Sequence, residues 1–428
     1  MKGENGKMKS NLEQTEIEAP YELPEGWKWC RLGEVAEIIM GQSPAGTSMT
    51  ENQNDIAFIG GASDMGEELP NISRYTSEPT KLSKRDDVIV CIRATLGRPI
   101  FSDGIYCLGR GVAGIRSETL MKEYIKYGFL NFEQYLYDKA TGSTFLQVSS
   151  KYLNEMPFPL PPTLAEQQRI VNRIESMFAK LDEAKEKAQN VVDGFETRKA
   201  AILHKAFTGE LTAKWRKENG VSDDSWEEKK IGECCIPRAG YAFDSKKFTT
   251  AGFQIIRMGN LYAGELDLSR NPVYYSENDL DDSIKKRALI ADGDILITIT
   301  GTKYMRDNGY AVRIDNPNDL LVNQRILCLT PKNEIKTNYL LYYLHSNMFR
   351  NVFFSNETGG VNQGNVSSKF VESISFRVPA LPEQQEIVRI LDTVLEKETR
   401  AKEAGQTVLD QIALLKKSIL ARAFRGEL

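Results

Sequence analysis

Two long stretches of the chain place apolar residues three and four positions apart, which is the spacing of an amphipathic helix. One follows Pro161-Pro162 and the other follows the segment from Pro379 to Pro382, where proline favours the start of a helix. Each predicted helix runs for about forty residues, or roughly 60 Å. The predicted seam consists of Ile170, Ile174, Met177, Leu181, Ala184, Ala188, Val191, Phe195 and Ile202, interrupted by Arg198, and of Ile387, Leu391, Val394, Ala401, Gly405, Val408, Ile412, Leu415 and Ile419, interrupted by Glu398.

A helix of this length with one apolar stripe needs a partner, and each predicted helix suits the other. Antiparallel pairing sets small residues against small and large against large: Ala184 with Gly405, Ala188 with Ala401, Leu181 with Val408, Ile174 with Leu415 and Ile170 with Ile419. Parallel pairing would set Ile170 against Ile387 and also match small residues, so register leaves both open. Connectivity favours the antiparallel form, because each helix then ends beside the other half of the chain.

Short runs of β-branched residues indicate buried strands between the helices. The clearest are 87–92 and 294–299, each followed by a turn of small residues at 93–98 and 300–303. The segments that contain them are therefore predicted to be mixed α/β modules with long loops.

Motifs that occur twice in the same order show that the chain is a duplication. The first set recurs at a spacing of 199, and the others at 217 or 218, so the interior of the second copy is longer. The matched stretches are Trp27, Leu32-Gly33-Glu34 and Gly41 with Trp226, Ile231-Gly232-Glu233 and Gly240; 148–152 with 366–370; Glu166-Gln167-Gln168 with Glu383-Gln384-Gln385; and 206–211 with 423–428. Conserved ends around divergent interiors suggest two versions of one recognition device.

These patterns predict an α+β protein in which two mixed α/β modules are joined by two long helices that form an antiparallel coiled coil with pseudo-twofold symmetry. The predicted boundaries are a flexible tail at 1–20, a first module at 21–162, a first helix at 163–212, a second module at 213–380 and a second helix at 381–428.

Composition narrows the function classes. The 428 residues are 41% apolar and carry a formal net charge of −4, so there is no overall basic signature for nucleic acid. The six cysteines form no C-x-x-C pair, and neither a metal site nor a disulfide framework is expected. The polar first residues and the lack of a long apolar run predict a cytoplasmic protein.

Catalytic constellations are not recognisable in the sequence. The two histidines, His204 and His345, have no nucleophile or carboxylate motif around them, and no phosphate-binding G-x-x-x-x-G-K-[ST] loop occurs. We therefore expect a chain that is not an enzyme and binds no cofactor or metal.

The repeated motifs resemble those of the specificity subunit of type I restriction-modification enzymes. The resemblance rests on 23–28, on Pro159-Leu160-Pro161-Pro162 leading to 166–171, on its second copy from Pro379 to Val388, and on the twofold Ala-Phe-x-Gly-Glu-Leu ending, and it covers nearly the whole chain. It implies that each module is a target-recognition domain for one half of a split, asymmetric DNA site. It also implies docking of methyltransferase subunits, two being expected, which bind S-adenosylmethionine, and of a restriction subunit with translocase activity.

Base-reading residues are expected on turns beside strands, where Arg, Lys, Asn, Gln, Ser and Thr can reach phosphates and base edges. In the first module the candidates are Gln42, Ser43, Arg93, Thr95, Arg98, Arg110, Ser143, Thr144 and Lys151. In the second they are Tyr241, Arg257, Asn260, Thr302, Lys303, Tyr304, Arg306, Asn323, Gln324, Arg325, Asn362, Gln363 and Lys369. Lys151 and Lys369 recur at matched positions, which favours a role in the scaffold.

The charge balance within the modules limits DNA binding by the chain alone. Residues 20–162 hold 14 Lys and Arg against 18 Asp and Glu, and residues 213–380 hold 22 against 21. Either charge is segregated onto one face or partner subunits neutralise phosphates, so weak binding by the isolated chain is expected. A rigid spacer would set the half-sites about one helical turn apart on one face of the duplex.

Two other classes of protein compete with this interpretation. A coiled-coil adaptor or scaffold with two ligand-binding modules would explain the helices, but not the divergent, loop-rich modules. An enzyme built from repeats would explain the modules, but not the lack of a catalytic constellation. Co-purification with an adenine methyltransferase separates these possibilities.

Overall fold

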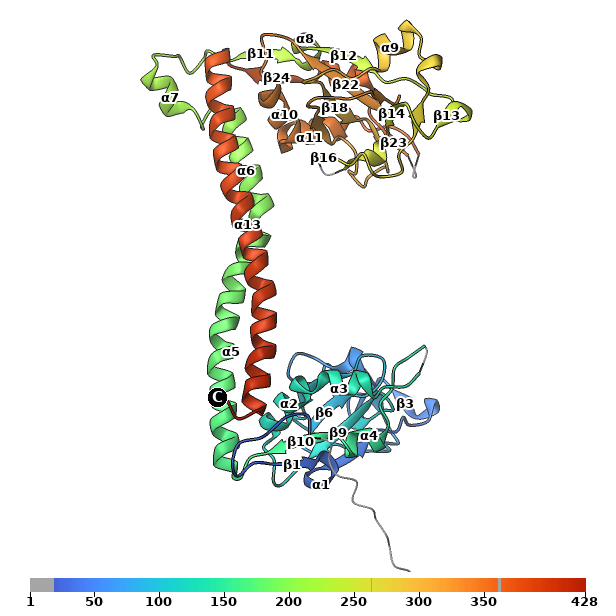
Figure 1. Ribbon diagram of the computed structural model, residues 1–428, viewed down its shortest axis with the longest axis vertical. Coiled ribbons are helices and arrows are strands. Elements are labelled where there is room, and N and C mark those ends of the chain that lie inside the picture. The colour runs from blue at the N-terminus through green and yellow to red at the C-terminus, as the bar shows by residue number, and fades with distance from the viewer. Residues whose placement is uncertain (1–18, 143, 263, 361–362) are drawn as a thin grey trace, which may run out of the picture. The chain divides into compact units, whose positions relative to one another are not determined.

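The computed structural model describes residues 19–142, 144–262, 264–360 and 363–428, which form two compact units (Figure 1). The first unit contains residues 19–189 together with 406–428, and the second contains 190–405. Each unit therefore combines one globular module with parts of two long helices.

The module of the first unit is built on two four-stranded sheets. The central sheet is antiparallel, with the order β2 (Glu37–Met40), β9 (Val112–Arg116), β6 (Val88–Cys91) and β7 (Gly97–Phe101). The outer sheet has the order β3 (Met49–Thr50), β5 (Tyr75–Thr76), β4 (Ile56–Ile59) and β8 (Cys107–Leu108), and its last pair is parallel. Strand β6 is buried along its whole length, as expected of an apolar β-branched run at the centre of a sheet.

The module of the second unit repeats both sheets. Its central sheet has the order β12 (Cys235–Ala239), β22 (Ile326–Pro331), β18 (Ile295–Thr298) and β20 (Ala311–Arg313). Its outer sheet has the order β13 (Phe248–Thr249), β17 (Tyr274–Tyr275), β14 (Phe253–Ile256) and β21 (Leu320–Val322). Two further strand pairs are β15 (Leu261–Tyr262) with β16 (Glu265–Leu266) and β19 (Thr300–Gly301) with β23 (Gly364–Asn365). The duplication predicted from the motifs is confirmed at the level of topology.

A short antiparallel ladder closes each module by joining its start to its end. In the first, β1 (Lys28–Arg31) pairs with β10 (Pro157–Leu160); in the second, β11 (Glu227–Lys230) pairs with β24 (Ser375–Val378). Short helices flank the ladders and sheets: α1 (Leu32–Val35), α2 (Lys122–Asn131), α3 (Glu133–Asp138) and α4 (Ser150–Asn154) in the first unit, and α7 (Ala213–Glu218), α8 (Ile231–Cys234), α9 (Asp282–Ala288), α10 (Thr337–His345), α11 (Asn347–Ser355) and α12 (Ser368–Ser373) in the second.

The long helices are α5 (Leu164–Asp193), α6 (Phe195–Thr208) and α13 (Leu381–Phe424). The predicted first helix is therefore interrupted at Gly194, whereas the second is continuous over 44 residues. The interruption has a local cause: the Arg198 guanidinium donates a 2.8 Å hydrogen bond to the carbonyl of Val191 and so occupies an acceptor of the helix ladder.

Helix pairing within each unit is antiparallel, as predicted. In the first unit, Asp182 and Lys416 form a 2.5 Å ion pair, and Ile170 shares a core with Phe424. In the second unit, Arg198 and Glu398 form a 2.6 Å ion pair. The two residues that interrupt the predicted seams therefore bind each other. Parallel pairing is excluded, because it would bring Ile170 beside Ile387, which belongs to a different core.

The predicted seam of α5 and α6 is confirmed, since all its positions are buried or half-buried, but that of α13 is partly wrong. Ala401 is exposed, as are Val408 (37%) and Leu415 (49%), so the pairs that involve them do not form. Lys402 and Lys416 occupy the facing positions instead, with their ammonium groups 4.6 and 4.8 Å from the ring centres of Phe195 and Phe178. Counting apolar residues could not identify this seam, because lysine buries its aliphatic stem. The pair of Ala184 and Gly405 stays a prediction.

The repeated Glu-Gln-Gln motif fastens each long helix to its module. The side chain of Gln167 accepts a hydrogen bond from the amide of Met121 (2.9 Å) and donates to the carbonyl of Thr119 (3.0 Å). Gln384 does the same with the amide of Lys336 and the carbonyl of Glu334, at 2.8 and 3.1 Å. These glutamines are almost fully buried, so the motif is explained by satisfied polar groups in the scaffold.

The repeated Ala-Phe ending anchors the helix that arrives from the other half of the sequence. In the first unit the ring of Phe424 packs 4.8 Å from that of Tyr124, and in the second Phe207 lies 5.3 Å from Tyr339. All six cysteines are buried free thiols. In the part of the chain that the structure describes, every helix is too short or too polar to cross a membrane.

Candidate DNA interface

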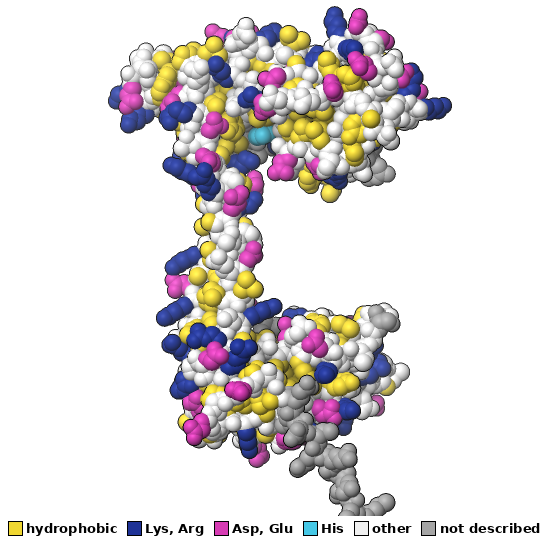
Figure 2. All heavy atoms as spheres, in the orientation of Figure 1, with side chains coloured by type: hydrophobic (Ala, Val, Ile, Leu, Met, Phe, Trp, Pro, Cys, Tyr) yellow, Lys and Arg dark blue, Asp and Glu magenta, His cyan; other side chains and the backbone are white. Residues whose placement is uncertain are grey.

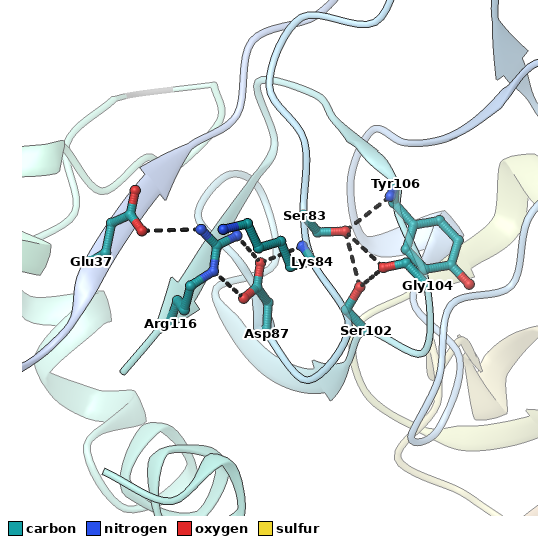
Figure 3. Close-up of polar contacts among 8 residues, drawn as sticks. All are labelled: Glu37, Ser83, Lys84, Asp87, Ser102, Gly104, Tyr106 and Arg116. Carbon is teal, nitrogen blue, oxygen red and sulfur yellow. Dashed lines mark hydrogen bonds and ion pairs between the residues drawn. The ribbon is translucent and has the colours of Figure 1, made fainter. Parts of the chain in front are cut away.

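Each candidate interface is built around the central strand of its module, and a buried aspartate fixes where that strand begins. Figure 3 shows Asp87 accepting two 2.8 Å hydrogen bonds from Arg116 and a third, of 2.7 Å, from the amide of Lys84. Arg116 also reaches Glu37, and nearby the hydroxyls of Ser83 and Ser102 are 2.9 Å apart. The hydrogen bond to Asp87 raises the pKa of Arg116, so the guanidinium stays charged.

The second module uses the same aspartate with a different arginine. Asp294 is fully buried and is bound by Arg238 and by the Thr330 hydroxyl, both at 2.5 Å, and by the amide of Ala291 at 2.8 Å. Arg238 comes from β12, whereas Arg116 comes from β9. The buried aspartate before the central strand is therefore retained, whereas the arginine that binds it comes from a different strand.

The repeated glycine places one loop of each module on the same frame. An added Cβ at Gly41 would lie 2.1 Å from the carbonyl oxygen of Gly109, and one at Gly240 would lie 2.1 Å from that of Asn323. Only glycine lets the backbones approach so closely. The loops held in this way are 109–111 and 323–325, which we call the reader loops. The amide of the first residue of each loop donates a hydrogen bond to a carbonyl of the outer sheet: that of Ile59 at 2.8 Å in the first module and that of Ile256 at 3.1 Å in the second.

In the second module the reader loop closes an open polar pocket of about 460 Å³. Its lining includes five residues predicted from the sequence and three that were not: Arg257, Asn260, Asn323, Gln324 and Arg325, and Met258, Arg270 and Asn271. A neighbouring pocket of about 280 Å³ shares Arg325 and adds the predicted residues Thr302 and Gln363. Arg325 is exposed and lines both pockets, and among the described residues no side chain bonds its guanidinium.

Asn260 is wrong as a direct reader, although it lines the pocket. Its side chain is 3% exposed, and its amide nitrogen donates to the carbonyls of Asp267 and Arg270, both at 2.9 Å. Its oxygen accepts from the amide of Arg257. Asn260 therefore shapes the rim of the pocket.

The first module brings Gln42, Ser43 and Arg110 together. The Ser43 hydroxyl accepts hydrogen bonds from the amide and the Nε of Arg110, at 3.2 and 3.4 Å. Asp64 takes the place of Asn260 and is bound by Arg74 at 2.7 Å. The prediction missed Arg74, because only the fold brings residue 74 beside residue 64.

The loops that follow the central strands also carry predicted residues. Val148 donates to the carbonyl of Ile92, and Val366 to that of Ile299, both at 2.9 Å. The start of 93–98 therefore lies beside 146–148, and the start of 300–307 beside 364–366. Arg93, Thr95 and Thr144 are exposed there in the first module, and Lys303, Tyr304 and Arg306 belong to the matching place in the second.

The remaining predicted residues line neither of these two pockets. Arg98 donates to the carbonyls of Ala62 and Met65, and Tyr241 forms a bridge with Asn323. Lys151 and Lys369 are exposed on the short helices α4 and α12. Ser143 and Asn362 lie outside the described residues. On the face drawn in Figure 2, Lys and Arg alternate with Asp and Glu over both modules, so the described surface there shows no continuous basic area.

Comparisons with known proteins agree with this architecture. The profile of the family described as "Type I restriction modification DNA specificity domain" matches residues 24–192 and 223–408. A putative type I restriction enzyme MjaX specificity subunit from Methanocaldococcus jannaschii is 30% identical over 197 residues, which are 45% of each protein. The type I restriction enzyme EcoKI specificity subunit from Escherichia coli is 26% identical over 292 residues, 68% of this chain and 61% of that protein. The alignments thus span less than two thirds of these two relatives.

Solved structures share the fold at low sequence identity. The HsdS subunit from Thermoanaerobacter tengcongensis superposes with a TM-score of 0.65 at 20% identity, covering 96% of this chain and 100% of that one. A chain from a structure of the type I R-M system gives a TM-score of 0.73 at the same identity and coverage.

Proposed function

Because the chain belongs to the type I restriction-modification DNA specificity family, we propose that it selects a two-part, asymmetric DNA sequence for a type I restriction-modification complex. Each module reads one half of the site. The chain supplies specificity and no catalysis, and S-adenosylmethionine binds to the partner methyltransferase subunit. The cytoplasmic location expected from the sequence is part of this proposal.

One observation carries the proposal: the same frame presents different chemistry in the two modules. The first reader loop is Gly109-Arg110-Gly111, and the second is Asn323-Gln324-Arg325, each closed by the same backbone bonds. Arginine matches guanine edges, and Asn or Gln matches adenine edges, in the major groove. Two modules with the same backbone arrangement but different hydrogen-bonding side chains favour two half-sites of different sequence, so the target is not a palindrome.

Docking of a methyltransferase subunit is assigned to the outer side of α13. Val408, Leu414 and Leu415 are exposed by 37%, 68% and 49% on a helix whose other exposed positions are mostly charged or polar. A partner helix with an apolar stripe would cover these side chains and supply phosphate contacts that the modules, with their balanced charge, lack. Two methyltransferase subunits and one restriction subunit complete the proposed complex.

Co-expression with the adenine methyltransferase tests the function. The full chain should co-purify with it and direct methylation of one bipartite sequence, read by methylome sequencing, whereas the isolated chain binds the same duplex weakly. Replacing Leu414 and Leu415 by Glu should release the methyltransferase. Ile236→Glu, at a residue 55% exposed on β12, is the matched control. If the chain assembles with the methyltransferase but the methylation pattern is the same as that of the methyltransferase alone, the result would instead support an adaptor.

A further inference from the structure

A strained loop beside the second reader loop holds large apolar side chains in water. The loop covers 302–307, and we call it the wedge loop. Its tip presents Tyr304 and Met305, which are exposed by 75% and 70% and are the two most exposed large apolar side chains among the described residues. Tyr304 has a φ of 69° and Arg306 a φ of 53°, a region that residues other than glycine rarely adopt.

Four side chains hold the base of the wedge loop by hydrogen bonds. Asp307 accepts a 2.6 Å hydrogen bond from the amide of Thr302, and Glu357 accepts one of 3.2 Å from the amide of Tyr304. Lys303 donates to the carbonyl of Gly359 at 2.7 Å. Arg350 donates to the carbonyl of Arg306 at 3.1 Å and also holds the two carbonyls that follow the loop. Strain that is fixed by so many contacts is a property of functional sites.

The first module has an exposed aromatic residue at the matching place. Phe145 and Leu146 are exposed by 58% and 37%, next to Gln147, which exchanges two backbone hydrogen bonds with Thr141. Arg93 lies over the ring of Phe145 at 5.9 Å, much as Lys303 lies over that of Tyr304 at 5.0 Å. The two modules thus reach the same result with different loops: an aromatic ring held in water, backed by a cation, at the end of the central strand.

We infer that these side chains are wedges that enter the base stack of the bound duplex, Tyr304 and Met305 in one half-site and Phe145 in the other. The inference rests on the proposed function. Apolar wedges between base steps unstack and kink DNA, and aromatic rings stack on any base. DNA fits better than a protein partner, because Thr302 and Arg325 line the pocket at the foot of the wedge loop and Lys303 and Arg306 flank its tip. Each module therefore contacts base edges with its reader loop, while its wedge selects base steps that unstack easily.

The inference is tested with the complex of the full chain and its methyltransferase subunit, on duplexes that carry 2-aminopurine at successive positions of the methylated sequence. The wild-type complex should raise 2-aminopurine fluorescence at one step in each half-site. Tyr304→Gly combined with Met305→Ala should abolish the rise in one half only and weaken binding about 10-fold, while Tyr304→Phe retains both. Phe145→Ala should abolish the rise in the other half.

Matched controls and a stability measurement separate wedging from structural roles. Ile105→Ala removes a side chain 59% exposed in the first module, and Ile236→Ala one 55% exposed in the second; both should leave the fluorescence unchanged. Glycine at position 304 relieves backbone strain, so the melting temperature should hold or rise while the signal disappears. If the wild-type complex binds tightly with no fluorescence rise, or if the rise survives in the double variant, the inference is overturned and the proposed function still stands. Loss of the methyltransferase subunit in the double variant assigns the tip to protein docking and overturns it too. A wild-type complex that binds no duplex refutes the proposed function.

Discussion

The two modules share their sheets, their closing ladders and the buried glutamines Gln167 and Gln384, yet they differ in the residues of the reader loops and of their surroundings. Gly109-Arg110-Gly111 stands where the second module has Asn323-Gln324-Arg325, and Asp64 with Arg74 stands where the second has Asn260 with backbone carbonyls. The first module also carries more acidic than basic residues, while the second is nearly neutral. A frame that satisfies its own polar groups leaves the outward residues free to diverge.

The largest expected difference concerns the glutamate that starts each long helix. Glu383 is 1% exposed and is bound by Thr212 and Arg216 at 2.6 and 2.7 Å, whereas Glu166 pairs with Arg169 at the surface. Arg216→Met would leave a buried carboxylate without a cation and should cost the second unit about 3 to 5 kcal/mol of unfolding free energy. Arg169→Met should cost the first unit less than about 1 kcal/mol. Hydrogen exchange resolved by unit, across a urea series, measures both, and equal losses would contradict the distinction.

We expect each reader loop to determine the specificity for one half-site only. Arg325→Ala should remove about 1 to 3 kcal/mol of discrimination in one half-site, and Arg110→Ala should affect only the other half. Methylation rates on duplexes altered in one half at a time give the comparison. Both variants relaxing the same half would show that the modules do not read separately.

A smaller effect is expected from the ion pair that joins the two seam interruptions in the second unit. Arg198→Glu places two carboxylates together and should lower stability by about 1 kcal/mol or less, because both side chains are partly exposed. Adding Glu398→Arg restores a pair of opposite charges and should recover the loss. The melting temperatures of the wild type, the two single variants and the double variant form a double-mutant cycle. A double variant that is no more stable than Arg198→Glu would rule out direct pairing.

The smallest predicted difference is a response to acid, because both histidines lie in the second unit. Burial lowers the pKa of His345, whose Nε2 lies 2.7 Å from the carbonyl of Ala311. The unfolded chain therefore binds a proton more readily, so stability is full above the ordinary histidine pKa of about 6.5 and falls as the pH drops through it. His345→Gln should flatten this slope in the second unit. Exchange rates of the first unit over the same pH range provide the internal control.

Much of the fold could be predicted because its signals are local or repeated. Proline before a periodic stretch located the starts of α5 and α13, and duplicated motifs located both modules. The seam of α13 was misassigned at Val408 and Leu415, because Lys402 and Lys416 face the partner helix and periodicity counts lysine as polar. That choice depends on which neighbour a long side chain meets, which the pattern along one helix does not contain.

The candidate interface was predictable to the extent that readers lie on turns after strands. This rule found Arg257, Gln324 and Arg325, which the fold gathers around one pocket. It failed for Asn260, whose amide is consumed by backbone carbonyls. It also missed Arg74, which tertiary structure brings beside Asp64 in the first module, and Arg270, which tertiary structure brings to the pocket of the second. Residue type and turn position therefore predict where a reader can be, and hydrogen-bond satisfaction decides which one is free.

The hydrogen bond from Tyr21 to the carbonyl of Phe424, 3.1 Å long, has a consequence for the topology of the chain. It brings the start of the first module beside the end of the last helix, where Arg169 also holds the carbonyl of Leu428 at 2.8 Å. At the equivalent place in the second unit, Phe207 and Trp226 are joined by continuous chain. The start of the first module and the end of α13 therefore meet within the first unit, so a linker from residue 428 to residue 21 combined with a cut at 219–224 should yield a circular permutant with both modules intact.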